Sequence, residues 1–252
     1  MIPIKSAEEL KIMKEGGKIT AQVLRKVLDS VRPGKTLEGL DKYAEGLILK
    51  FGGKPSFKMV DDYNFSTCIN VNEGVVHGIP SKRVIKLGYI VSVDIGVYYR
   101  GFHTDAARTI LVGEGGEKEF GLEEFLKTGR KALDKAIEQC GVGKSVGDLS
   151  RAIQETVEGE GYSVVRQLVG HGVGRSLHEP PEIPGFVTGG RAVILKEGMT
   201  LAIEVIYNQG DWPVVTDKRD GWTIDSKDGS ISALFEDTVA ISRMGPIVLT
   251  NN

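Results

Sequence analysis

The sequence has few cysteines, little net charge and no long apolar segment. Its 252 residues include only two cysteines, Cys68 and Cys140, without CxxC spacing, so we expect reduced thiols and no disulfide framework. No run reaches the roughly 18 to 20 apolar residues that span a bilayer, and the first residues lack the apolar block of a secretory signal. The net charge of -2 provides no general attraction to nucleic acid or to acidic membranes. We therefore predict a cytoplasmic protein that binds neither DNA nor a membrane.

A pattern of two helices followed by strands occurs twice in the chain. Capping signals and apolar spacing predict helices over residues 7–30, 37–51, 122–139 and 146–158, and strand-like segments follow each pair. The breaks inside the two pairs resemble each other, Gly34-Lys35-Thr36 against Gly143-Lys144-Ser145. We predict an α+β fold in one domain over residues 1–252, built from pseudo-repeats of about 1–115 and 116–252 that share a middle of antiparallel sheet.

The two Gly-Lys-Thr/Ser triplets do not have the spacing of a phosphate-binding loop. Such a loop carries a glycine five residues before its Gly-Lys pair, and those positions hold Asp29 and Glu138. No strand runs into either triplet. We interpret each triplet as a turn followed by a helix N-cap.

Two aspartates lie in a segment that is otherwise typical of a buried hairpin, "SVDIGVYYRGFHTDAART". A turn centred on Tyr99-Arg100 places Asp94 directly opposite Asp105, where two like charges repel. The carboxylates could lie on a solvated face, share a proton as an acid/base pair, or hold a metal. In the last two cases a positive charge offsets the repulsion.

Further buried polar residues favour the metal. Glu204 in "MTLAIEVIYN" and Glu236 in "SALFEDTVAIS" lie inside apolar strands, where an unpaired carboxylate is costly. His171 ends a strand in "VVRQLVGHG", and His178 follows it. Four carboxylates and one imidazole nearly balance two divalent cations, and this oxygen-rich set suits Mn, Fe(II) or Co at least as well as Zn. Two metals can supply hydroxide near neutral pH, which indicates a hydrolase.

At this point the motifs match a known family. The residues Asp94, Asp105, His171, Glu204 and Glu236, in the contexts "VDIG", "TDAART", "GHGVGRSLHE", "AIE" and "FEDT", resemble the metal site of the methionine aminopeptidases. The segments "NEGVVHGIP" and "DGWT" add to a resemblance that covers essentially the whole chain. It implies the pita-bread fold, two divalent metal ions (Co, Mn, Fe(II) or Zn), and removal of the initiator methionine, favoured when the second residue is small. The lack of a long insertion between His171 and Glu236 is similar to type I enzymes.

The resemblance also implies a role for each site residue. Asp94 would bind one metal, Asp105 and Glu236 would link both, and His171 and Glu204 would complete the other. Glu204 would also accept the proton of the attacking water. His178 would donate to the carbonyl oxygen as charge develops, and His77 would contact the scissile amide nitrogen or the departing amine. The methionine pocket would be lined by Tyr63, Cys68, Leu177 and Trp222. The implied partners are N-terminal Met peptides and nascent chains at the ribosome, with the enzyme a monomer.

Several alternatives stay open from the sequence. The four pocket residues could be ordinary core residues. A thiol protease that uses Cys68 is another alternative, but it would leave the buried carboxylates without a function. Prolidases and proline aminopeptidases share the fold and metal set but usually carry a further N-terminal domain. A pita-bread module could also bind peptides without cleaving them. The chain departs from the family pattern at Val205, at Leu177 and at Asp237, which would add a charge beside the site if its side chain turned inward.

Overall fold

The structure is a computed structural model that describes residues 1–113, 117–189 and 193–251. The helices in these residues are α1 (Ala7–Leu28), α2 (Leu37–Lys50), α3 (Glu117–Glu138) and α4 (Val146–Gly159), with a short 3-10 helix η1 (Phe57–Met59). The strands are β1 (Lys54–Pro55), β2 (Cys68–Val71), β3 (Gly74–Val76), β4 (Ile90–Tyr99), β5 (Phe102–Leu111), β6 (Ser163–Val164), β7 (Val169–Gly172), β8 (Glu179–Pro184), β9 (Thr200–Asn208), β10 (Val214–Thr216), β11 (Ile224–Ser226), β12 (Ser232–Ser242) and β13 (Gly245–Val248). None of the described helices is long and apolar enough to cross a membrane.

The helices begin at the capping residues that the sequence indicates. The Ser6 hydroxyl accepts a hydrogen bond from the Glu9 backbone N–H at 3.3 Å, and the Glu9 carboxylate accepts one from the Ser6 N–H at 2.8 Å. The Thr36 hydroxyl caps α2, and the Asp148 carboxylate accepts from the Ser145 N–H at 2.7 Å at the start of α4. These bonds satisfy N–H groups that lack a partner inside the helix. They confirm that both Gly-Lys-Thr/Ser triplets are turns leading into helix N-caps.

Helix α3 differs from the prediction at its start. It begins at Glu117, earlier than the expected start at Leu122, and Gly121 lies inside it. An interior glycine costs about 1 kcal/mol relative to alanine. Buried side chains farther along the helix, such as Phe125 and Leu133, pack into the core over β9 and β12, and this packing outweighs the local cost.

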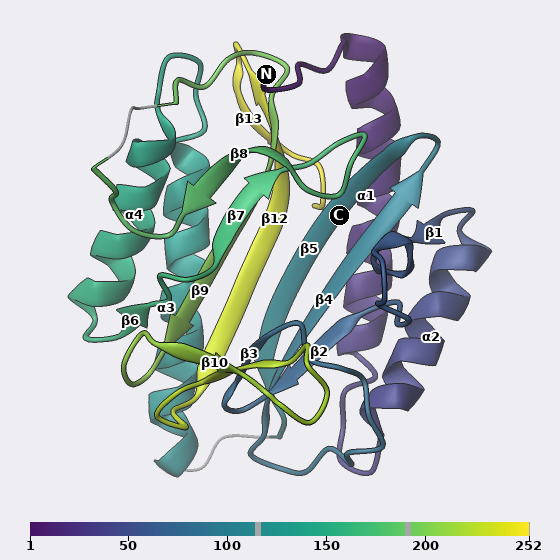
Figure 1. Cartoon of the computed structure of the whole chain (residues 1–252), viewed down its shortest axis with the longest axis vertical. Coiled ribbons are helices and arrows are strands. Elements are labelled where there is room, and N and C mark those ends of the chain that lie inside the picture. Colours follow the sequence, from purple (N-terminus) through teal and green to yellow (C-terminus); the bar gives the residue numbers. More distant parts are fainter. Residues whose placement is uncertain (114–116, 190–192, 252) are drawn as a thin grey trace.

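One large antiparallel sheet joins the two halves of the chain (Figure 1). Its strands follow the order β1-β4-β5-β12-β9-β7-β8, so the β4–β5 hairpin of the first half lies beside β12 and β9 of the second. Helix α1 packs on β4 and β5, and α3 packs on β9 and β12. A smaller sheet, β10-β11-β3, lies near one end of these strands (Figure 1). The helices cover one face of the large sheet and leave the other face for a site.

Matching backbone bonds relate the two halves. The Gly34 N–H donates to the carbonyl of Ile85 at 3.0 Å, and the Gly143 N–H donates to the carbonyl of Leu195 at 3.0 Å. Both glycines have positive φ, 88° and 89°, which glycine adopts without strain. The same turn thus ties the helix pair to the segment that precedes β4 in the first half and β9 in the second.

The turn of the β4–β5 hairpin lies one residue later than predicted. Tyr99 pairs with Phe102, so the two turn residues are Arg100 and Gly101. Both have positive φ, 48° and 98°, as the two-residue turn that best matches the twist of a hairpin requires. The predicted turn was centred on Tyr99-Arg100, one residue too early.

This shift corrects the predicted relation of the two aspartates. Asp94 pairs with Ala107, and Asp105 pairs with Gly96. The aspartates are therefore diagonal neighbours and not directly opposite. Because Asp105 and Ala107 are two residues apart on one strand, Asp94 and Asp105 still point to the same face of the sheet.

Candidate metal centre and active site

Five neighbouring strands direct polar side chains to the face of the large sheet that the helices leave free. The residues are Asp94 on β4, Asp105 on β5, His171 on β7, Glu204 on β9 and Glu236 on β12. The register places them on the same side: Glu236 pairs with Glu204 and with Ala107, and His171 pairs with Ala202. All five metal ligands expected from the sequence thus converge on one place.

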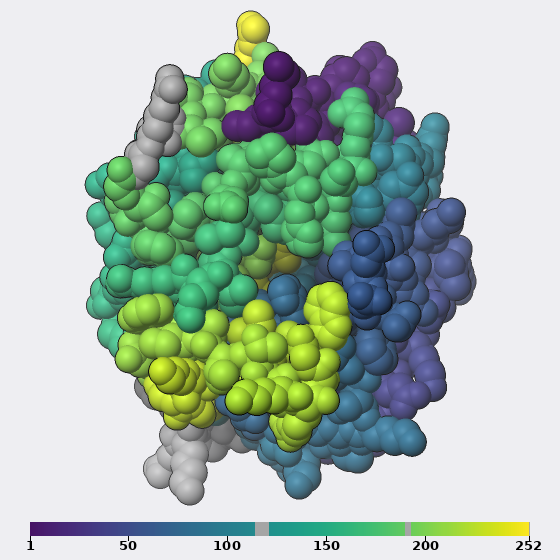
Figure 2. Space-filling view, viewed as in Figure 1, coloured from purple at the N-terminus to yellow at the C-terminus, as the bar shows by residue number. Residues whose placement is uncertain are grey.

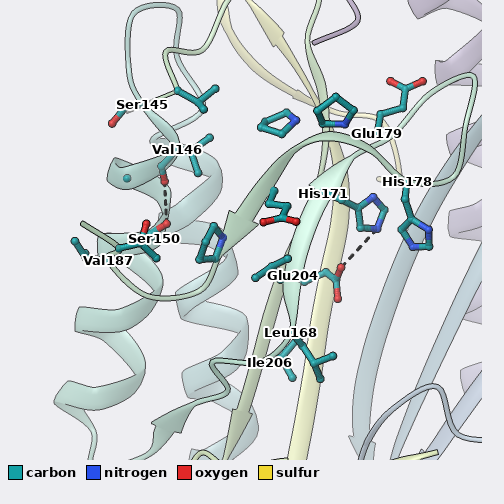
Figure 3. A pocket seen from close by; sticks show the side chains of 18 of the residues that line it. Ser145, Val146, Ser150, Leu168, His171, His178, Glu179, Val187, Glu204 and Ile206 are labelled. Atoms are coloured by element: carbon teal, nitrogen blue, oxygen red, sulfur yellow. Dashed lines mark hydrogen bonds and ion pairs between the residues drawn. The ribbon is translucent and has the colours of Figure 1, made fainter. Parts of the chain in front are cut away.

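The side chains lie close enough to share an ion. One ligand atom each from Asp105, His171 and Glu236 lies within 4.8 Å of the other two. The His171 Nε2 is 3.6 Å from the Glu204 Oε1, as the dashed line in Figure 3 marks. Asp94 adjoins this group on the hairpin, as the diagonal neighbour of Asp105.

The carboxylates are buried and incompletely satisfied. Asp105 is 4% and Glu236 is 2% exposed. Within the described residues, the Oδ1 atoms of Asp94 and Asp105 and the Oε1 atom of Glu236 have no hydrogen-bond partner. A buried charge without a partner costs several kcal/mol, which cations at this position would offset. The set of four carboxylates and one imidazole therefore fits divalent metal ions.

Titration properties agree with a crowded anionic site. Burial is the largest cause that raises the pKa of each carboxyl group, to about 6 for Asp105, to about 8 for Glu204, and well above the usual range for Asp94 and Glu236. The negative charge of Asp105 adds to the shift of the other three. Without a cation, Asp94, Glu204 and Glu236 would therefore resist ionisation near neutral pH.

His171 is held in the form that binds a metal. Burial lowers its pKa to about 4, so the imidazole is neutral at pH 7. Its Nδ1 lies 2.9 Å from the carbonyl oxygen of Gly172, which can only accept, so Nδ1 carries the proton. The Nε2 atom then carries a lone pair that is directed toward Glu204 and is free to bind a metal.

Two further histidines reach the cavity above the carboxylates. His178 lies on the loop between β7 and β8, and its ring centroid is 4.4 Å from that of His171 in an edge-to-face arrangement. His77 follows β3 directly and adopts a positive φ of 56°, rare for a residue other than glycine. Both side chains are exposed to the cavity, and desolvation by its walls lowers the pKa of His178. A neutral imidazole with a free N–H is the form available near pH 7.

A small apolar cavity adjoins the carboxylates. The four expected pocket residues, Tyr63, Cys68, Leu177 and Trp222, belong to one apolar cluster, and Cys68 pairs in register with Asp94. The cavity measures about 130 Å³, which suits a single side chain rather than a larger ligand. Three more of its lining residues, Val76 at the end of β3, Phe57 and Val60, were not predicted from the sequence. Of these, Phe57 and Val60 lie in and beside the short η1 helix, where no motif marks them.

A larger, open groove continues from the same site. It has a volume of about 1100 Å³ and runs from His171, His178 and Glu204 past Leu168 and Ile206 to the start of α4 (Figure 3). Figure 2 shows an opening in the middle of this face, bordered by green segments above and lime segments below. The site therefore has a small apolar end and a larger open end.

Two of the departures from the family pattern lie outside the site. Val205 is fully buried among the side chains under α3 and α4. Asp237 points to the helix side, where its carboxylate accepts hydrogen bonds from Arg108 Nη2 and from the Thr250 hydroxyl, both at 2.7 Å. The Asp237 side chain therefore points away from the metal site, and its negative charge is only the smallest of the causes that raise the pKa of Glu236. The third departure, Leu177, does line the apolar cavity.

The Asp237 ion pair should matter for stability and not for catalysis. We expect Asp237→Ala to lower the free energy of unfolding by about 1–3 kcal/mol, because the partly buried Arg108 would lose its carboxylate partner while keeping its bonds to the carbonyls of Ala107 and Glu236. The kcat of the folded fraction should stay within about twofold. Denaturant unfolding and initial rates measure both, with Asp134→Ala, which removes an exposed ion pair on α3, as the matched control. A large loss of kcat without a loss of stability would contradict this assignment.

Comparisons with known proteins agree with the geometry. The sequence model of metallopeptidase family M24 matches residues 11–243 of the chain. The chain is 44% identical over 250 residues to the methionine aminopeptidase of Clostridium perfringens, covering 99% of each chain. It is also similar to the crystal structure of the methionine aminopeptidase from Thermotoga maritima, with a TM-score of 0.95, 46% identity and coverage of 100% of both chains. The prolidase from Pyrococcus furiosus has a TM-score of 0.78 at 26% identity, but the chain covers only 65% of it.

Proposed function

The chain belongs to metallopeptidase family M24 and, within it, to the type I methionine aminopeptidases, and we propose that it removes the initiator methionine from new polypeptides. The observation that carries the proposal is the apolar cavity of about 130 Å³ beside a cluster of buried carboxylates and one histidine. A free N-terminal methionine fills such a cavity with its side chain and brings its carbonyl carbon to the polar residues.

The proposed cofactor is a pair of divalent metal ions, of Mn, Fe(II), Co or Zn. Asp94, Asp105, His171, Glu204 and Glu236 would hold these ions. When bound, such ions polarise a carbonyl group and make hydroxide available near neutral pH. The unpartnered oxygens of Asp94, Asp105 and Glu236 support this arrangement.

The remaining polar residues have separate tasks in the proposed mechanism. Glu204 accepts the proton of the attacking water and can pass it to the departing amine. His178 donates its N–H to the carbonyl oxygen as negative charge develops there. His77, at the boundary between the apolar cavity and the groove, contacts the scissile amide nitrogen. Tyr63, Cys68, Leu177 and Trp222 hold the methionine side chain.

The groove accounts for the rest of the substrate. The methionine pocket has room for one side chain, so the polypeptide that follows the cleaved bond leaves through the larger groove, along Leu168 and Ile206. Peptides that begin with methionine and nascent chains at the ribosome are the proposed substrates. We further propose that residues 1–252 act as one catalytic unit and as a monomer.

Substrate choice tests the proposed function. Peptides that begin Met-Ala should be cleaved at least about 10-fold more efficiently than peptides that begin Met-Leu, because the second side chain must fit beside Val76, Leu168 and Ile206. Free methionine should be the product, and peptides of the Xaa-Pro type should be poor substrates. The measurement is kcat/KM for the metal-loaded protein on the three peptide classes. Equal rates on Met-Ala and Met-Leu, or a preference for Xaa-Pro, would instead favour a prolidase-like hydrolase.

A further inference from the structure

A buried ion pair ties the N-terminal segment to the loop that carries His178. The Lys5 Nζ lies 2.5 Å from the Glu179 Oε2, and the two side chains are only 1% and 6% exposed. Glu179 directly follows His178 in the sequence. Lys5 precedes the N-cap of α1 and touches neither the carboxylate cluster nor the two cavities.

Two glycines make room for Lys5. A Cβ atom at Gly174 would lie 2.6 Å from the Lys5 Nζ and closer still to its Cε, and a Cβ atom at Gly198 would lie 2.7 Å from the Lys5 carbonyl oxygen. The Lys5 backbone N–H also donates to the Gly198 carbonyl at 2.8 Å. The lysine therefore sits in a space that requires glycine on both sides.

Several contacts, including those of Glu179, hold the loop in place. The Glu179 Oε1 accepts a hydrogen bond from the Ser176 N–H at 3.2 Å. Glu179 itself pairs with Gly172, the residue after His171, across β7 and β8. The Gly174 carbonyl accepts from the His103 N–H at 2.7 Å, and an exposed ion pair joins Arg175 to Glu9. The segment between the two site histidines is thus anchored by its backbone and by Lys5.

His178 depends on this anchor because of its place in the chain. Successive side chains of extended backbone point to opposite sides. Figure 3 shows His178 on the side of His171 and Glu204, with Glu179 pointing away from them. Any turn of the backbone that releases Glu179 from Lys5 would rotate the His178 imidazole as well. Apolar residues of similar size would often stabilise a fold as well as a buried ion pair does. The role of this pair is therefore to be sought in the geometry of the loop.

We propose that Lys5 is a positioning residue for catalysis: through Glu179, it holds the His178 N–H where the scissile carbonyl oxygen must lie. The inference rests on the proposed function, in which His178 donates to that oxygen. A displacement of about 1 Å at a reacting centre can cost about 10² in rate. Losing Lys5 should therefore lower kcat while leaving substrate binding and the metal ligands in place.

A double-mutant cycle tests the inference. Lys5→Met keeps the length and packing of the side chain and removes its charge. We expect it to lower kcat about 10- to 100-fold on a Met-Ala-Ser peptide, with KM within about threefold and bound metal unchanged. In the His178→Ala background the same substitution should cause no further loss of kcat. A purely structural role of Lys5 would reduce kcat equally in both backgrounds.

Two further variants keep the test decisive. Gly174→Ala retains the lysine but displaces its ammonium group, so it should reproduce the kcat effect of Lys5→Met even if that variant folds poorly. Lys42→Met removes an exposed ion pair on α2 and should leave kcat unchanged. Normal kcat in Lys5→Met, or equal losses with and without His178, would overturn the inference. Normal kcat in His178→Ala would overturn it together with the proposed role of His178, whereas methionine release by the wild type would still support the proposed function.

Discussion

Removal of divalent metal should abolish peptidase activity and lower the melting temperature, and both should return when Mn²⁺ or Co²⁺ is added. The reason is the unpaired burial of Asp94, Asp105 and Glu236, whose free oxygens have no other partner in the described residues. A cation that binds only the folded state stabilises it by mass action. Activity assays and thermal denaturation before and after chelation measure the effect. Dialysis against chelator-free buffer is the control, and full activity in a metal-free preparation would refute the proposed chemistry.

The metal-free protein should also show a characteristic pH dependence. The pKa of Asp105 rises to about 6 and that of Glu204 to about 8, from ordinary values of about 3.9 and 4.3 in the unfolded chain. The folded state therefore binds protons more tightly than the unfolded state, so these groups favour folding at low pH. Their contribution is lost as the pH rises from about 4 to about 8. Melting temperatures measured with and without Mn²⁺ should diverge as the pH increases through this range, and parallel curves would contradict the assignment.

The two histidines should separate metal binding from chemistry. We expect His178→Ala to fold normally and keep its metal while kcat falls by about 10² to 10³, the usual loss for one donor to a developing oxyanion. His171→Ala should instead lose metal affinity, because its Nε2 is directed toward Glu204 within the carboxylate cluster. Metal analysis and single-turnover kinetics on both variants measure this. His103, a buried histidine that is not part of the carboxylate cluster, bonds to the Ser56 hydroxyl at 2.9 Å and is the matched control: His103→Gln should retain the metal and most of kcat.

Two outcomes would contradict this division of roles. His178→Ala could empty the site, which would make His178 a ligand. It could also leave kcat unchanged, which would remove it from the mechanism. Either result would be visible in the same two measurements.

The polar residues of the site could be predicted from sequence because each breaks a local rule. Glu204 and Glu236 interrupt apolar strands, and His171 ends one among glycines, so each needed an explanation beyond packing. Strand alternation then limits them to one face. Their convergence across five strands required the order of the sheet, which the family resemblance supplied and the structure confirms.

Other features depend on interactions that no local pattern records. The hairpin turn could lie at Tyr99-Arg100 or at Arg100-Gly101, and only the pairing of the whole strands selects the second. Phe57 and Val60 line the cavity from a short segment without periodicity. Asp237 lies next to Glu236 in the sequence, yet it faces Arg108 on the other side of the sheet. The fold class and the fold family were predicted correctly, whereas register and side-chain partners needed coordinates.

The most direct test of the metal centre is anomalous diffraction from crystals grown with Mn²⁺. The proposed arrangement predicts two anomalous peaks about 3.5–4 Å apart. They should lie between the carboxylates of Asp105 and Glu236, with one peak beside Asp94 and the other beside His171 and Glu204. The absence of anomalous density at these five residues in an active preparation, or metal bound only elsewhere on the protein, would contradict the account.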